Sequence, residues 1–138
     1  MTQQYVKELT GAYPGIREVW LLGSRANGTA TEVSDWDYLV FLGDDRIFNA
    51  LCQDRRFKRS GIDLLVIGSL GDIASCPWTE DDGYTKTLGL GDKPNGIRWR
   101  LVSATEACYF EPTDRQSEGS LSMVTAYRPA KALRVYPP

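Results

Sequence analysis

Three aspartates are spaced as a metal-dependent reaction would require. Asp35 and Asp37 lie two residues apart at the start of one apolar run, and Asp63 lies at the start of a later one. Residues two apart on a strand point to the same face, with Cα atoms roughly 6.6 Å apart. If the two runs form neighbouring strands, we expect the three carboxylates to converge on one small volume.

Such a cluster of carboxylates is unfavourable without a counter-charge. Two like charges at 4 Å repel by about 4 kcal/mol at an effective dielectric of 20. A divalent cation removes this repulsion, and ligands that are all oxygen suit Mg²⁺ or Mn²⁺ better than Zn²⁺. The spacing therefore predicts a metal site formed by Asp35, Asp37 and Asp63.

A glycine–serine step precedes the aspartates in the chain. Gly23 ends an apolar run, and a glycine at that point lets the backbone approach a ligand closely. Ser24 offers a hydroxyl and a backbone N–H to phosphate oxygens, and Arg25 adds a cation that could reach a triphosphate. These three residues predict a site for a nucleoside triphosphate, bridged by metal to the carboxylates.

Three segments occur in a fixed order: GSRANG at 23–28, SDWDY at 34–38, and Asp63. Together they resemble the polymerase beta-like nucleotidyltransferase superfamily, and most closely its minimal nucleotidyltransferases. The resemblance covers residues 17–68. It implies transfer of a nucleoside monophosphate from a nucleoside triphosphate, with ATP the expected substrate, to an acceptor, with release of pyrophosphate.

The resemblance also implies a role for each site residue. Asp35 and Asp37 would bind the catalytic metals, and Asp63 would complete the site and help to activate the acceptor hydroxyl. Gly23 and Ser24 would hold the triphosphate. The acceptor stays open between a protein hydroxyl, a small molecule and an RNA end.

A different class of function fits the same fold. The group includes antitoxins that partner HEPN toxins, so a toxin partner or a non-catalytic nucleotide sensor is the alternative hypothesis. Two positions depart from the family pattern. Asn27 stands where many members have a basic residue, and Trp36 is bulkier than the usual aliphatic residue.

Several short elements must position these residues. A helix is expected over residues 2–11, and buried strands over 19–22, 36–42 and 62–67, the last two closed by glycine. A second helix is expected after Asp44 or Asp45, either of which can cap it. This order predicts an α/β (α+β) fold, with a mixed β-sheet and helices packed on one side.

The length of 138 residues predicts a single domain, residues 1–138, with a motif core at 17–68 and an extension at 69–138. In the extension, alternating apolar residues predict a hairpin between 84–90 and 97–101. Further strands are expected at 107–111 and 132–136. The acidic residues 80–82 are expected to form a solvated turn.

Composition excludes several classes of chemistry. The chain has no histidine, which excludes Ser-His-Asp and Cys-His catalysis and histidine zinc sites. Three widely spaced cysteines suit a reducing compartment, and no apolar run approaches the ~18 residues of a membrane span. We therefore expect a cytoplasmic protein without a membrane partner. The net charge of −2 argues against non-specific coating of nucleic acid.

Overall fold

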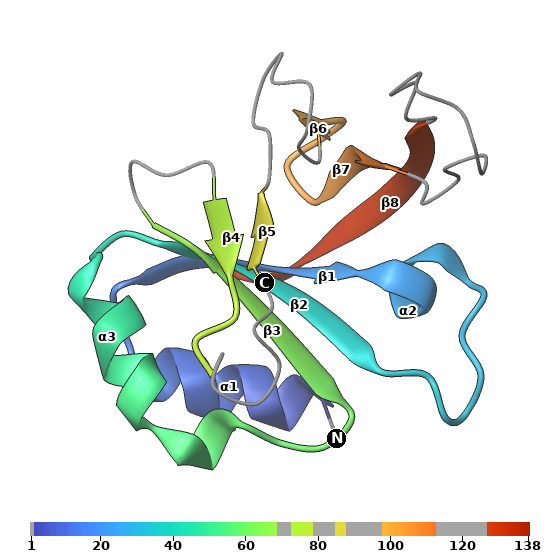
Figure 1. Ribbon diagram of the computed structural model, residues 1–138. Helices are drawn as coiled ribbons and strands as arrows, with labels where there is room; N and C mark the ends of the chain where they lie inside the picture. The colour runs from blue at the N-terminus through green and yellow to red at the C-terminus, as the bar shows by residue number, and fades with distance from the viewer. Residues whose placement is uncertain (1, 69–72, 79–84, 88–97, 113–126) are drawn as a thin grey trace, which may run out of the picture.

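The computed structural model describes residues 2–68, 73–78, 85–87, 98–112 and 127–138 (Figure 1). Three α-helices and a 3-10 helix accompany the strands of one sheet in this part of the chain. The helices are α1 (Thr2–Ala12), α2 (Gly23–Asn27), α3 (Arg46–Gln53) and η1 (Arg55–Phe57). The strands are β1 (Ile16–Leu22), β2 (Trp36–Leu42), β3 (Ile62–Ile67), β4 (Ile73–Ser75), β5 (Thr85–Thr87), β6 (Arg98–Leu101), β7 (Glu106–Pro112) and β8 (Tyr127–Tyr136).

The strands form a single mixed sheet in the order β5-β4-β3-β2-β1-β8-β7-β6. Only β2 and β3, of the pairs described, run parallel, and α3 makes the crossover between them as a parallel pair requires. The other described pairs are antiparallel. The expected mixed sheet is therefore confirmed, and the strands at 36–42 and 62–67 begin and end where the sequence places them.

One face of the sheet, the helix face, packs against α1 and α3. Tyr5 and Leu9 of α1 and Leu51 of α3 are almost fully buried there against alternate strand residues such as Tyr38 and Leu64. Figure 1 shows both helices on the same side of the sheet. The expectation of helices on one side is confirmed, because the strands place every second apolar residue toward them.

The opposite face, here called the concave face, is covered by the sheet itself. The ring of Trp99 on β6 lies 5.0 Å from that of Trp20 on β1 and 5.7 Å from that of Phe41 on β2. In a flat sheet β6 and β2 would be roughly 19 Å apart, at about 4.8 Å per strand. The sheet therefore curls until β6 and β7 close over β1 and β2.

The predicted hairpin between residues 84–90 and 97–101 is wrong. β5 and β6 lie at opposite edges of the sheet. β5 pairs with β4, and β6 pairs with β7 across a turn in which the N–H groups of Val102 and Ser103 donate to the Glu106 carbonyl. The alternation of apolar residues determines which face of the sheet each side chain points to, but not which strand pairs with which. Residues 88–97 and the acidic residues 80–82 lie outside the described part of the chain.

The expected strands at 107–111 and 132–136 are confirmed within β7 and β8, and both are longer. The helix expected after Asp44 or Asp45 is confirmed as α3, which ends at Gln53. Asp44 accepts a hydrogen bond from the Arg46 N–H at its start, whereas Asp45 makes no side-chain cap. No helix among the described residues is long and apolar enough to span a bilayer.

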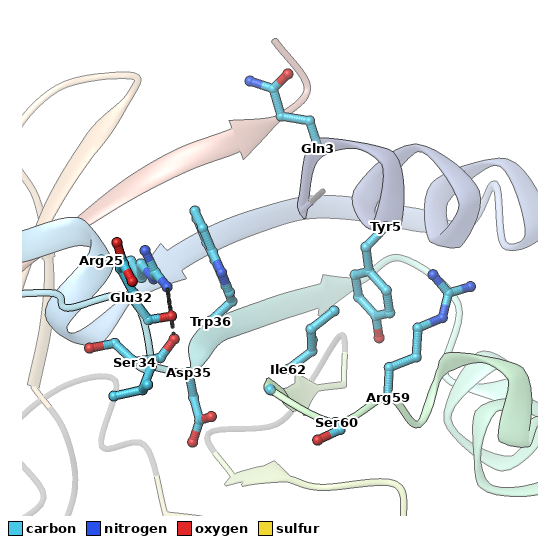
Figure 2. Close-up of a pocket in the computed structure, with 12 residues that line it drawn as sticks. Gln3, Tyr5, Arg25, Glu32, Ser34, Asp35, Trp36, Arg59, Ser60 and Ile62 are labelled. Carbon is cyan, nitrogen blue, oxygen red and sulfur yellow. Dashed lines mark hydrogen bonds between the residues drawn. The ribbon is translucent and has the colours of Figure 1, made fainter.

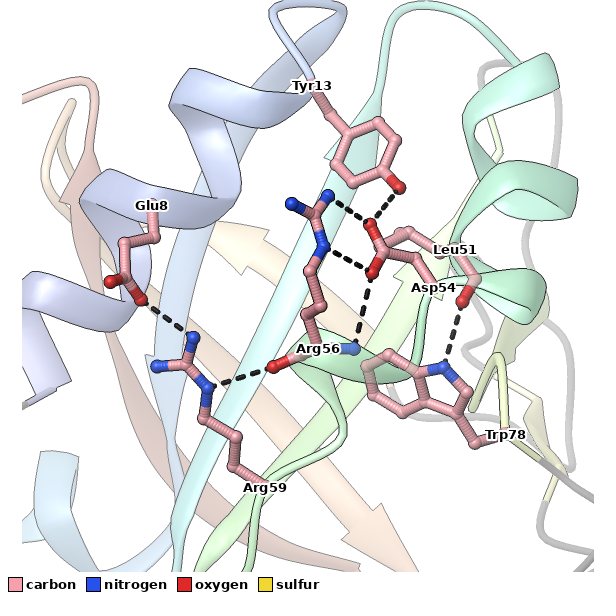
Figure 3. A network of polar contacts seen from close by, with 7 residues as sticks. All are labelled: Glu8, Tyr13, Leu51, Asp54, Arg56, Arg59 and Trp78. Atoms are coloured by element: carbon pink, nitrogen blue, oxygen red, sulfur yellow. Dashed lines mark hydrogen bonds and ion pairs between the residues drawn. The ribbon is translucent and has the colours of Figure 1, made fainter.

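A polar network on the helix side joins the end of α1 to the turn after α3 (Figure 3). The Asp54 carboxylate accepts a hydrogen bond from the Tyr13 hydroxyl at 2.6 Å and from the Arg56 guanidinium at 2.7 and 2.9 Å. It also accepts one from the Arg56 backbone N–H, which starts η1. Arg56 first, and then Tyr13, holds the pKa of Asp54 well below its usual range. Burial and the Asp54 carboxylate raise the pKa of Tyr13 to about 12.

This network predicts a pH dependence of stability. The folded-state pKa of Asp54 is depressed, so its contribution is present above the unfolded pKa of about 3.9 and is lost as the pH falls below it. Asp54→Asn is expected to lower the free energy of unfolding by about 1–2 kcal/mol at pH 7. Urea titrations at pH 7 and near pH 2.5 test this, because the difference between variant and wild type should shrink at the lower pH. An equal difference at both values would contradict it.

Candidate functional site

Two of the three predicted carboxylates lie side by side. Asp37 on β2 and Asp63 on β3 are register partners in the parallel pair. Neighbouring strands are about 4.8 Å apart, so the two backbones bring these side chains within reach of one cation. The Trp36 N–H donates to the Gly61 carbonyl at 2.8 Å. This hydrogen bond helps to fix the register where the two strands begin.

The aspartates lie on the concave face. On β2, Leu39 and Phe41 pack in the concave-face core, and Asp37 shares their side because it lies two residues from Leu39. On β3, Leu65 packs in the same core and places Asp63 on that side too. Asp35 directly precedes β2, and in Figure 2 its carboxylate points away from Trp36. Asp37 and Asp63 are therefore brought to one face of the sheet, and Asp35 lies at the same end.

The donor set fits a hard divalent cation. Asp35 and Asp63 are exposed and Asp37 is half-buried, so all three are oxygen donors that solvent reaches. In the described part of the chain, no three acidic or cysteine side chains are already gathered into a metal cage. Mg²⁺ usually binds through one or two carboxylates, keeping waters or substrate phosphates as its other ligands. The adjacent pair of Asp37 and Asp63 can supply those carboxylates.

Gly23 packs directly against the Asp37 carboxylate. A Cβ at position 23 would occupy the place of Asp37 Oδ2, and the Gly23 φ of +67° lies in the left-handed region. Leu22 and Asp37 are register partners across β1 and β2, which sets this approach. The structure thus brings the predicted glycine–serine turn against the predicted carboxylates, and it requires glycine at this position for two separate reasons.

Arg25 is not brought to the carboxylates. Its guanidinium lies 4.4 Å from the centroid of the Trp36 ring and donates to the Ser34 carbonyl at 3.0 Å. Trp36 packs with the helix-face core, so this guanidinium lies across β2 from Asp37. Arg25 therefore ties down residues 28–35, the loop that leads into Asp35.

A hollow of about 750 Å³ adjoins the site on the helix side, where β2 and β3 begin (Figure 2). Trp36 and Tyr5 face it, each with an arginine over its ring: Arg25 at 4.4 Å and Arg59 at 5.2 Å. Asp35 belongs to the rim of this hollow as well as to the carboxylate set. The site is therefore open at the end of the sheet from both faces.

Asn27 has a structural partner that the sequence did not reveal. Its side-chain amide exchanges two hydrogen bonds with the backbone of Lys131 on β8, at 2.8 and 3.0 Å. The same amide donates to the Gly23 carbonyl at 2.7 Å. An asparagine at this place in the family pattern therefore joins α2 to the C-terminal strand, which a basic residue would not do with the same geometry.

Tyr109 of β7 also reaches the site. Its hydroxyl accepts a hydrogen bond from the Gly23 N–H at 3.0 Å, across 86 residues of sequence. No local pattern could have indicated this contact, because it depends on the curl that brings β7 over β1. The sequence offered only a general signal for it, which is that the hydroxyl of a buried tyrosine usually has a hydrogen-bond partner.

Comparison with known proteins bears on the same segment. Residues 3–63 match the family described as the nucleotidyltransferase domain, and this span includes Gly23, Ser24 and all three aspartates. A solved structure of a candidate nucleotidyltransferase from Sulfolobus solfataricus is 28% identical to this chain, with a TM-score of 0.41. That match covers 49% of this chain and 64% of the archaeal one. No curated protein matches the chain.

Proposed function

We propose, from the match of residues 3–63 to the nucleotidyltransferase domain family, that the protein transfers a nucleoside monophosphate from ATP to an acceptor hydroxyl. The observation that carries the proposal is the register of β2 and β3. It sets Asp37 beside Asp63 on the face where the Gly23 turn packs against the Asp37 carboxylate. A triphosphate at the turn would lie next to the acidic pair.

Asp35, Asp37 and Asp63 would hold Mg²⁺ or Mn²⁺. When bound, such a cation supplies positive charge that stabilises the phosphate oxygens and the leaving group during transfer. Gly23 and Ser24 would hold the triphosphate with its α-phosphorus toward the acceptor. A contact between Arg25 and the triphosphate stays a prediction, since the guanidinium would have to leave Trp36 and the Ser34 carbonyl.

The transfer itself is a single displacement. The acceptor oxygen bonds to the α-phosphorus while the bond from that phosphorus to the bridging oxygen breaks, and pyrophosphate leaves with that oxygen. The acceptor hydroxyl would give up its proton to Asp63, which is exposed and lies beside Asp37 at the start of β3.

The test is an assay of the purified protein with each of the four nucleoside triphosphates and Mg²⁺. We expect release of pyrophosphate with ATP, together with a mass increase of one AMP on the protein, on an added small-molecule hydroxyl or on an RNA end. Omitting the metal should abolish the reaction. Binding of ATP without pyrophosphate release would instead support the alternative of a nucleotide sensor or an antitoxin.

A further inference from the structure

The Gly23 turn is held by groups from the C-terminal strands. Both polar groups of the Gly23 backbone are engaged: its N–H donates to the Tyr109 hydroxyl on β7, and its carbonyl accepts from the Asn27 amide. Asn27 is bonded in turn to the Lys131 backbone on β8. Neither strand lies within the segment that matches the family, residues 3–63.

Tyr109 is itself rigidly placed. Its side chain is 1% exposed, and its ring stacks on that of Trp99, with centroids 6.3 Å apart. Trp99 in turn packs edge-on against Trp20 of β1. The hydroxyl oxygen therefore meets the Gly23 N–H from a fixed direction, set by the curl of β6 and β7 over the concave face.

We propose that Tyr109 is a positioning residue for nucleotide transfer, through which the C-terminal strands set the triphosphate-binding turn. This inference rests on the proposed function. The Gly23 N–H already donates to the Tyr109 hydroxyl, so this hydrogen bond orients the turn. The phosphates would then be bound by Ser24. Because Gly23 also packs on the Asp37 carboxylate, the same contact sets the turn relative to the acidic pair.

Tyr109→Phe removes this hydrogen bond and keeps the aromatic ring. We expect the KM for ATP to rise about tenfold, as loss of one hydrogen bond to a half-buried N–H allows, with kcat within about twofold of wild type. Direct titration with a non-hydrolysable ATP analogue and Mg²⁺ should show the same weakening. Asn27→Ala, which releases the Gly23 carbonyl from β8, should also raise KM.

Tyr13→Phe is the matched control. The Tyr13 hydroxyl also makes one hydrogen bond between distant segments, to the Asp54 carboxylate at 2.6 Å, but on the helix face and away from the Gly23 turn and the hollow. Its loss should lower the unfolding temperature and leave KM unchanged. A Tyr109→Phe enzyme with wild-type KM, or an equal rise of KM in Tyr13→Phe, would overturn the inference while leaving the proposed function standing. A wild-type protein that neither binds nor turns over ATP would overturn both.

Discussion

Asp37→Asn is expected to reduce nucleotidyl transfer about a thousandfold, the loss that follows when several kcal/mol of charge stabilisation by a metal site are removed. Asp37 is the central member of the acidic set: it lies beside Asp63 in register, follows Asp35 by two residues and contacts the Gly23 turn. Asparagine keeps the shape of the side chain but removes its negative charge and one of its two oxygen ligands. Rates of pyrophosphate release at saturating ATP and Mg²⁺ measure the effect.

The same substitution should leave the fold intact. Removing one of two adjacent carboxylates relieves their repulsion in the metal-free protein, so the unfolding temperature should change by less than about 4 °C. Asp44→Asn is the control, because Asp44 lies beyond the other end of β2 in an exposed ion pair with Arg46. It should transfer at the wild-type rate. Undiminished transfer by Asp37→Asn would refute the assignment of the site.

Gly23→Ala is expected to combine a loss of stability with a loss of activity. A residue with a Cβ at a φ of +67° costs about 1–2 kcal/mol, and the new methyl group would displace the Asp37 carboxylate. Displacement of a reacting group by about 1 Å lowers rates about a hundredfold. Urea denaturation and steady-state transfer assays on the same preparation measure the two effects separately.

Gly28→Ala separates the backbone effect from the contact with Asp37. Gly28 ends α2 with a φ of +73°, but a Cβ there would meet nothing within 4 Å. The positive φ should lower the free energy of unfolding of this variant by a similar amount. Its rate of transfer should stay within about threefold of wild type. If Gly28→Ala lost activity as severely as Gly23→Ala, backbone strain in α2 would explain both results, and the contact with Asp37 would not.

The strands that carry the candidate carboxylates could be predicted because their signals are local. Short apolar runs closed by Gly43 and Gly68 mark β2 and β3, and strand alternation then puts Asp35 and Asp37 on one face. The one non-local step was that β2 and β3 are neighbours. An apolar helix pattern between two such runs favours that arrangement, since it supplies the crossover that a parallel pair needs.

The C-terminal half could not be predicted in the same way. Alternation identified β7 and β8, but it led to the wrong pairing of residues 84–90 with 97–101, because β5 and β6 lie at opposite edges of the sheet. The Gly23–Tyr109 and Asn27–Lys131 contacts depend on how far that sheet curls. Arg25 is the opposite case. Its position in the sequence predicted a contact with the triphosphate. In the structure its guanidinium stacks on Trp36 and donates to the Ser34 carbonyl, and these contacts hold a loop.

The position of β8 has a consequence for biosynthesis. β1 is made early and β8 late, with residues 23–126 between them, yet the two are adjacent in the finished sheet. While the ribosome translates the intervening codons, the β1 edge has no strand to pair with and is open to intermolecular association. The nascent chain therefore cannot complete the contacts that hold the Gly23 turn until β8 has emerged from the exit tunnel.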